Sequence, residues 1–183
     1  MKIITGNPGT GKHTISRILA KKLGLELVDI NKVAIAEKIA EKSTQTLDVD
    51  VKKLGKILAK KTSKNVLLVG HLAPYVISKN NVEVAIVLRR NPYRLERIYK
   101  KREYTKQKAI ENLGAEILGI TYYDAIKNIG QKKTFQFDTT GKSIAYTVKR
   151  IESLFVKGKA KEDDVDWLKM VSKKGDLKQF FPY

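Results

Sequence analysis

The stretch Ile-Ile-Thr-Gly-Asn-Pro-Gly-Thr-Gly-Lys-His-Thr at residues 3–14 decides the fold of this chain. A short apolar run ends at Gly6, and a helical pattern begins just after Gly11 and Lys12. A strand, a glycine-rich loop and a helix in this order are typical of a phosphate-binding loop. The glycines let backbone N–H groups approach a phosphate, and the positive end of the helix favours an anion. Lys12 adds a mobile charge for the β- and γ-phosphates of a nucleotide.

One residue of the loop departs from the general pattern. Most such loops place Ser or Thr after the lysine, where the hydroxyl binds magnesium. This chain has His13 there, followed by Thr14, and His13 still offers its backbone N–H to a phosphate. A residue without a hydroxyl at this position is therefore compatible with a phosphate-binding loop.

The composition predicts one domain with a sizeable core, since the chain has 183 residues of which 42% are hydrophobic. It has no cysteine, which excludes disulfides and thiol-based metal sites. The N-terminus enters the first strand without a signal peptide, and no run of about 18 apolar residues occurs. We therefore expect a soluble cytoplasmic protein without a membrane partner.

The net charge of +18 is large for a chain of this size. Such an excess favours a polyanion such as RNA as a partner. A lysine-rich proteome, for example that of a thermophile, would give the same balance without a specific partner. Both hypotheses stand on the sequence, because nucleotide substrates are themselves anions.

Alternating strand and helix patterns predict an α/β fold. The strand at 2–5, the helix at 12–23 and the strand at 25–30 form a βαβ unit, in which the two strands are parallel. Gly24 ends this helix as a C-terminal cap. Further strands are predicted at 65–69, 82–88 and 134–138, and further helices at 31–42, from about 50 to 61, at 106–125 and at 143–155.

Two regions after the second strand are predicted to approach a substrate. The helices between the second and third strands, with a polar break at 43–46, occupy the place where nucleotide kinases cover the acceptor nucleotide. Asp48 and Asp50 are predicted to cap a helix there, or alternatively to play a polar role near the acceptor. His71 follows the third strand and is placed to meet phosphate, water or magnesium, unless it is only a loop histidine.

A basic stretch predicts a lid. Residues 89–108 contain nine Lys or Arg against two Glu. Such a run could be a solvated helix face, but it occupies the place where phosphoryl-transfer enzymes keep a mobile lid bearing arginines. Arg102 lies in a break between helical patterns at 102–105, so it is the predicted lid arginine, and Arg94 and Arg97 are weaker candidates.

Other features of the second half are assigned more simply. The loop at 139–142 follows the last strand and suits a purine base. On the helix at 106–125, Glu111, Asn112 and Glu116 are expected at the surface. The pattern weakens after residue 157, where an apolar cluster is expected to dock onto the body and an aromatic end either packs or binds a partner. The cluster is Trp167, Leu168 and Met170, and the aromatic end is Phe180-Phe181-Pro182-Tyr183.

Together these motifs resemble the adenylate kinase isoenzyme six family, also called the coilin-interacting nuclear ATPase family, and its archaeal branch in particular. The resemblance covers residues 2–156. It is carried by the loop at 6–14 and by Gly70-His71-Leu72, Arg102-Glu103-Tyr104, Glu111-Asn112-Leu113-Gly114-Ala115-Glu116-Ile117-Leu118 and Asp138-Thr139-Thr140-Gly141-Lys142.

The resemblance implies a P-loop NTPase fold, with a five-stranded parallel sheet of order 2-3-1-4-5 flanked by helices. It implies a nucleoside monophosphate kinase-like domain at 1–156, with a nucleotide monophosphate-binding insertion at 31–46 and a lid at 101–111, before a tail at 157–183. The implied activities are adenylate kinase and ATPase, with ATP, Mg²⁺ and AMP or another nucleoside monophosphate as ligands. The implied role is maturation of the small ribosomal subunit, with a platform ribosomal protein and rRNA as partners.

Site residues carry over by position. Lys12, His71 and Arg102 would be catalytic, and no residue is assigned as a metal ligand. The residues that would bind ATP are Gly9, Gly11, Lys12, His13, Thr14 and Arg102. Val69 stands where the family motif has an Asp before the histidine, which puts the efficiency of the chemistry in doubt. Asp29 is a candidate substitute.

The departure at Val69 leaves two other hypotheses open beside an adenylate kinase. One is an ATP-gated assembly factor that binds a ribosomal protein and rRNA and has little kinase activity. The other is a kinase for a different small-molecule acceptor.

Overall fold

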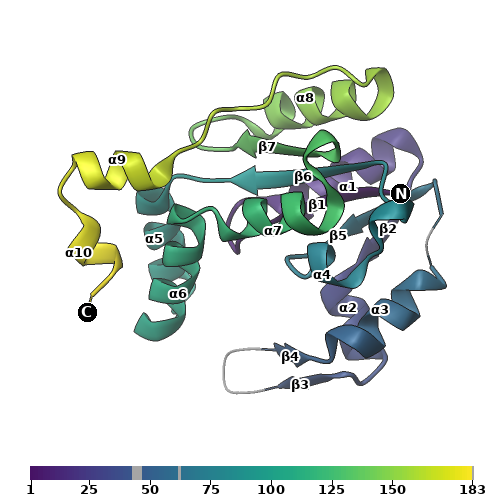
Figure 1. Ribbon diagram of the computed structural model, residues 1–183, viewed down its shortest axis with the longest axis horizontal. Coiled ribbons are helices and arrows are strands. Elements are labelled where there is room, and N and C mark those ends of the chain that lie inside the picture. Colours follow the sequence, from purple (N-terminus) through teal and green to yellow (C-terminus); the bar gives the residue numbers. More distant parts are fainter. Residues whose placement is uncertain (43–46, 62, 183) are drawn as a thin grey trace.

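The computed structural model describes residues 1–42, 47–61 and 63–182. At its centre is a five-stranded parallel sheet with the spatial order β2-β5-β1-β6-β7 (Figure 1). Counted along the chain within this sheet, the order is 2-3-1-4-5, so the predicted fold is confirmed. The strands are β1 (Lys2–Gly6), β2 (Glu26–Asp29), β5 (Val66–Val69), β6 (Val84–Arg89) and β7 (Thr134–Asp138).

The sheet is covered on both faces, as expected for parallel strands made of continuous apolar runs. Alternate strand residues point to opposite faces, so Ile3 and Leu68 lie in one core layer and Ile4 and Leu67 in the other. The second layer is completed by α1 (Lys12–Leu23) and α8 (Ile144–Lys157). The first is completed by α2 (Ile30–Ala36), α3 (Val51–Ala59), α4 (Ala73–Val76) and α7 (Ile120–Ile129).

The first βαβ unit follows the prediction. Helix α1 begins after Gly11 and ends at Gly24, whose N–H donates to the Ala20 carbonyl oxygen. Strands β1 and β2 are parallel, with β5 between them. At the end of β1, Gly6 has a φ of +138°, and a Cβ there would lie 2.4 Å from the Leu88 carbonyl oxygen. Glycine therefore lets the loop leave β1 in close contact with β6.

The prediction of a helix over 31–42 is wrong in its second half. Helix α2 ends at Ala36, and Lys38 then adopts a left-handed backbone with a φ of 53°. The chain continues into a hairpin in which β3 (Ala40–Lys42) pairs antiparallel with β4 (Leu47–Val49). The hairpin satisfies backbone groups that a longer helix would otherwise have paired. The predicted polar break at 43–46 lies outside the described residues.

Capping at the start of α3 is confirmed for one of the two acidic candidates. The Asp50 Oδ1 accepts the Lys53 N–H at 2.9 Å. The side chain of Asp48 lies outside the described part of the chain. Short 3₁₀ helices, η1 (Lys79–Asn81) and η2 (Gln131–Lys133), precede β6 and β7.

The basic stretch after β6 forms two helices, α5 (Pro92–Lys101) and α6 (Lys106–Ile117), with the predicted break at 102–105 between them. We call α5 and α6 the arm. The prediction of one helix over 106–125 is wrong, because Gly119 adopts a φ of 69° and separates α6 from α7. The Nη1 of Arg89 lies 3.5 Å from the place where a Gly119 Cβ would be. The break thus leaves room for a buried guanidinium.

The C-terminal tail docks on the arm (Figure 1). Trp167 and Met170 pack against its apolar core, as predicted, whereas Leu168 stays exposed. Phe180 is buried, so the aromatic end packs on the body through this residue. The helices α9 (Trp167–Lys173) and α10 (Leu177–Phe180) share with the arm a core formed by Leu95, Tyr99, Leu113, Ile117, Val171 and Phe180.

No helix within the described ranges has the length and apolar content needed to cross a membrane.

Candidate nucleotide-binding site

A cavity of about 1250 Å³ opens where the sheet strands end, and the loop between β1 and α1 lies along it. The carboxyl ends of the strands are where open α/β sheets bind ligands. Gly9 and Gly11 have φ angles of 88° and 95°, so the loop has the backbone expected from its glycines. The cavity is lined by every predicted site residue: Gly9, Gly11, Lys12, His13, Thr14, His71 and Arg102.

Lys12 is buried beneath the loop, and its Nζ donates to the Asn7 carbonyl oxygen at 3.3 Å. Burial, together with the charge of Arg102, lowers the pKa of Lys12 to about 8. The charges of Asp29 and Glu116 act in the opposite direction and are outweighed. A phosphate at the loop would favour the charged ammonium again, so Lys12 is suited to bind an anion.

His13 is tied to an acid on the neighbouring strand. Its Nδ1 lies 3.0 Å from the Asp29 Oδ2, while the Asp29 Oδ1 accepts the Asn31 N–H and caps α2. Burial raises the pKa of Asp29, but the hydrogen bonds from His13 and the backbone outweigh it and hold this pKa below its ordinary value. Asp29 is the register partner of Val69. A carboxylate is therefore present one strand away from the position where the resembled motif has its acid.

His71 follows β5 and lines the cavity, as predicted. Desolvation by the surrounding protein, together with the neighbouring Lys12 and His13, lowers the pKa of His71 to about 4. The side chain is also exposed to solvent. Because its pKa is lowered, the imidazole is neutral at pH 7. It can therefore donate a hydrogen bond from one ring nitrogen and accept one at the other.

Arg102 stands in the break of the arm, where it lines the cavity with Lys108. Aromatic rings support this break, since Tyr104 stacks on Tyr99 with ring centroids 5.0 Å apart and the Lys108 Nζ lies 4.3 Å from the Tyr104 ring. The arm therefore presents cations to the cavity from a supported turn. The weaker arginine candidates are exposed on α5, outside the described lining of the cavity: Arg94 and Arg97.

The loop after β7 borders the same cavity through Thr139 and Lys142. The Thr139 Oγ1 lies 3.2 Å from the Thr10 carbonyl oxygen, which joins this loop to the phosphate-binding loop. Lys142 is held by Asp163, with a separation of 3.0 Å between Nζ and Oδ2. The loop predicted to hold a base thus lies beside the phosphate site.

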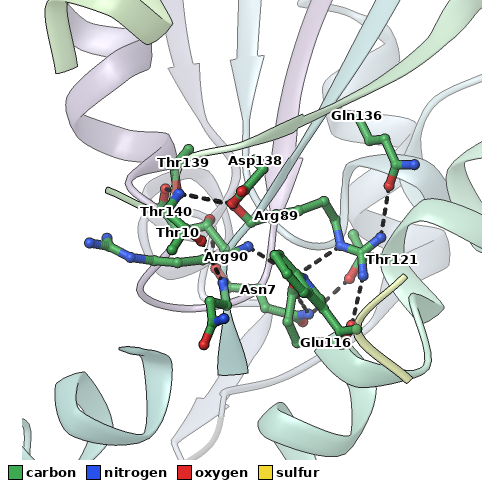
Figure 2. A network of polar contacts seen from close by, with 12 residues as sticks. Asn7, Thr10, Arg89, Arg90, Glu116, Thr121, Gln136, Asp138, Thr139 and Thr140 are labelled. Atoms are coloured by element: carbon green, nitrogen blue, oxygen red, sulfur yellow. Dashed lines mark hydrogen bonds and ion pairs between the residues drawn. The ribbon is translucent and has the colours of Figure 1, made fainter. Parts of the chain in front are cut away.

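A buried ion pair supports the loop, and the sequence analysis missed it. The Arg89 Nε donates to the Glu116 Oε1 at 2.9 Å, and the side chains are only 4% and 1% exposed (Figure 2). The expectation that Glu116 lies at the surface was therefore wrong. The helical spacing contained the signal, because Leu113, Glu116 and Ile117 fall on one face of α6 and that face is buried.

Arg90 is a second residue that the sequence analysis did not single out. It directly follows β6 and lines the cavity, and its Nη1 donates to the Gly9 carbonyl oxygen at 3.0 Å. Its Nε is buried and has no hydrogen-bond partner among the described residues. Arg89 is thus neutralised by Glu116, whereas Arg90 directs its guanidinium toward the loop (Figure 2).

Comparison with known proteins identifies the family of this chain. A protein family described as an AAA domain matches residues 3–119, which include the loop and the arm. The chain belongs to this AAA-domain family of P-loop kinases. This AAA-domain protein is 33% identical over 166 residues to a protein of Thermococcus onnurineus, covering 90% of this chain and 89% of the relative. It is 35% identical over 169 residues to a protein of Pyrococcus furiosus, covering 91% of each. Both relatives are provisionally named adenylate kinases.

The AAA-domain protein also resembles solved kinases. Against the shikimate kinase of Bacteroides thetaiotaomicron the TM-score is 0.58 at 17% identity, covering 84% of this chain and 96% of that enzyme. At this identity the likeness concerns the fold, and it agrees with the P-loop kinase architecture found here. The narrower assignment to the isoenzyme six family stays a prediction.

Proposed function

We propose that this protein is an adenylate kinase that transfers the γ-phosphoryl group of ATP to AMP and also hydrolyses ATP. The observation that carries this assignment is that Lys12, His71 and Arg102 line the same cavity. Its volume of about 1250 Å³ exceeds the roughly 300–1,000 Å³ usual for one small molecule. Such a volume suits a donor and an acceptor together. The provisional names of the relatives support AMP as the acceptor.

In this mechanism the chain acts by positioning and by charge. The loop amides and Lys12 hold the β- and γ-phosphates, and Arg102 moves in from the arm to neutralise charge on the transferring group. His71 is neutral at pH 7 and orients the attacking oxygen through a hydrogen bond. These residues reach the cavity from three different segments, which are the phosphate-binding loop, the end of β5 and the arm, so closing the arm would complete the site.

The residues around the loop also fit a magnesium ion, provided that substrate phosphates and water supply most of its ligands. No group of three or more His, Asp or Glu side chains among the described residues is arranged to hold a metal ion. Magnesium in kinases is usually held by one or two carboxylates together with substrate phosphates and water. Asp29 would supply that carboxylate, since it lies beside His13 and its charge reaches Lys12. The ion would neutralise negative charge on the phosphates.

We also propose the domain division predicted from the sequence. Asn31 and Tyr75 line the cavity near the region proposed for the acceptor, and Arg102 and Lys108 line it from the arm, the region proposed as the lid. The proposed parts are the kinase domain at 1–156, the acceptor insertion at 31–46, the lid at 101–111 and the tail at 157–183.

A second candidate function is an ATP-gated factor in small ribosomal subunit maturation, located in the cytoplasm and binding rRNA and a platform ribosomal protein. The net charge of +18 favours it, because so basic a surface attracts a polyanion. Val69 in place of the motif acid favours weak transfer chemistry as well. A kinase with another small-molecule acceptor is the third candidate.

Measuring ADP formation from ATP, with and without AMP, separates these functions. Multiple turnovers that depend on AMP support the adenylate kinase, whereas hydrolysis alone that RNA stimulates supports the assembly factor. Dependence on a different acceptor supports the third candidate. Lys12→Ala should abolish each of these activities, and Lys21→Ala, an exposed lysine on the same helix, is the matched control. Full turnover by Lys12→Ala would refute the site assignment.

A further inference from the structure

Glu116 joins the phosphate-binding loop to the C-terminal tail. Its Oε2 accepts the Asn7 Nδ2 at 2.7 Å, and its Oε1 accepts the Arg89 Nε at 2.9 Å and the Arg90 backbone N–H at 3.0 Å (Figure 2). The same Oε1 accepts the indole N–H of Trp167 at 3.1 Å. One buried carboxylate thus contacts the loop, the end of β6 and the tail.

Asn7 passes this constraint on to Lys12. Its backbone carbonyl oxygen accepts the Thr10 Oγ1 at 2.9 Å and the Lys12 Nζ at 3.3 Å. Its side-chain Oδ1 accepts the Thr121 Oγ1 at 3.3 Å. A shift of Asn7 would therefore move the Lys12 ammonium, which is proposed to bind phosphate, together with the loop at 6–14.

The tail is fixed independently of Glu116. Val171 and Phe180 are buried in the core of the arm, and the Phe180 ring meets the Tyr93 ring edge-on at a centroid distance of 5.2 Å. The Tyr93 hydroxyl donates to Asp176. Trp167 is therefore held against the arm by packing, and it presents its N–H to Glu116 from a defined position.

We propose that the tail is a positioning element for the nucleotide site, in which Trp167 holds Glu116, Glu116 holds Asn7, and Asn7 sets the loop and Lys12. This inference rests on the proposed binding of ATP at the loop. Trp167 and Glu116 touch no substrate, so they act as positioning residues. Since coupling between sites is reciprocal, docking of α9 strengthens nucleotide binding and nucleotide binding strengthens docking of α9.

A double-mutant cycle tests this coupling in the full-length chain. Trp167→Phe keeps an aromatic ring and removes the N–H donor, and it should weaken binding of a non-hydrolysable ATP analogue about five- to tenfold by calorimetry. Its effect should be strongly non-additive with that of Asn7→Ala. The matched control is Gln179→Ala, which removes a tail-to-arm contact with Glu96 at 3.2 Å and leaves Glu116 alone. This control should bind within about twofold of the wild type and be additive with Asn7→Ala.

Unchanged affinity of a folded Trp167→Phe, or additivity with Asn7→Ala, would overturn the inference. Hydrogen exchange of the unmodified protein keeps the test open should Trp167→Phe not fold. The analogue should slow amide exchange in Trp167–Lys173 as well as in residues 7–14. Protection of the loop without protection of α9 overturns only the coupling, whereas no protection of the loop overturns the proposed function itself.

Discussion

Glu116→Ala is the substitution that most directly tests the account of the site. Glu116 is 1% exposed and is the ion-pair partner of Arg89, which is itself buried. Alanine would leave the Arg89 guanidinium without a counter-charge away from solvent, although Gln136 Oε1 and the backbone carbonyl oxygen of residue 116 would still accept its hydrogen bonds. It would also remove the acceptor of the Asn7 amide and of the Trp167 indole.

The expected loss of unfolding free energy is about 4 kcal/mol, since breaking one partner of a buried ion pair typically costs roughly 3–5 kcal/mol. A chain of 183 residues has an unfolding entropy of about 0.4 kcal/mol/K near its melting temperature. A loss of this size would therefore lower Tm by about 10 °C. It would also remove a large part of the roughly 5–15 kcal/mol that stabilises a typical native protein.

Denaturant unfolding followed by circular dichroism, with a thermal scan, measures this loss. The matched control is Glu111→Ala, an exposed glutamate on the same helix that accepts a hydrogen bond from Gln107. We expect this control to change stability by no more than about 0.5 kcal/mol. If the two variants were equally stable, the ion pair would not support the loop in the way described here.

Four smaller predictions follow from the same geometry. Binding of ATP should weaken above a pH of about 8, because the pKa of Lys12 is lowered to about 8 and the side chain loses its charge there. Calorimetry at pH 7 and pH 9 tests this expectation. The Lys12→Ala variant should show no such pH dependence. Stability should fall as the pH drops from about 6.5 to about 4, because the pKa of His71 is lowered to about 4 in the folded state, so that the unfolded state binds the proton more readily in this window. His71→Asn should reduce that loss in denaturant titrations at the two ends of the window. Gly6→Ala should destabilise the fold by more than about 2 kcal/mol in denaturant unfolding, because a Cβ would lie 2.4 Å from a backbone oxygen. The control Gly141→Ala has open space around its Cβ position and should cost less stability in the same measurement. Arg90→Ala should weaken ATP binding about tenfold by calorimetry with little change in Tm, since a hydrogen bond to a charged group contributes about 1.5–3 kcal/mol; unchanged affinity would remove Arg90 from the site.

The sequence by itself determined the five strands of the sheet and the phosphate-binding loop of the candidate nucleotide site, whereas the strand order was expected only from the family resemblance. Apolar runs gave the five strands, and the glycines and Lys12 gave the loop, because both signals are local and depend only on neighbouring residues. Placing His71 at the cavity also needed little more than its position after a parallel strand. Arg102 was found from a break between two helical patterns.

Only the tertiary structure decided how these parts are held. Glu116 meets Asn7, Arg89 and Trp167 because β1 and β6 are neighbours and because the tail folds back over the arm. The contact between His13 and Asp29 depends in the same way on where β2 ends beside β5. Contacts between residues so far apart in the chain are set by the order of the strands and by which groups must be paired once water is excluded. Local sequence patterns contain neither the strand order nor the pairing of buried groups. The loop could therefore be located from the sequence, whereas the buried network that supports it could not.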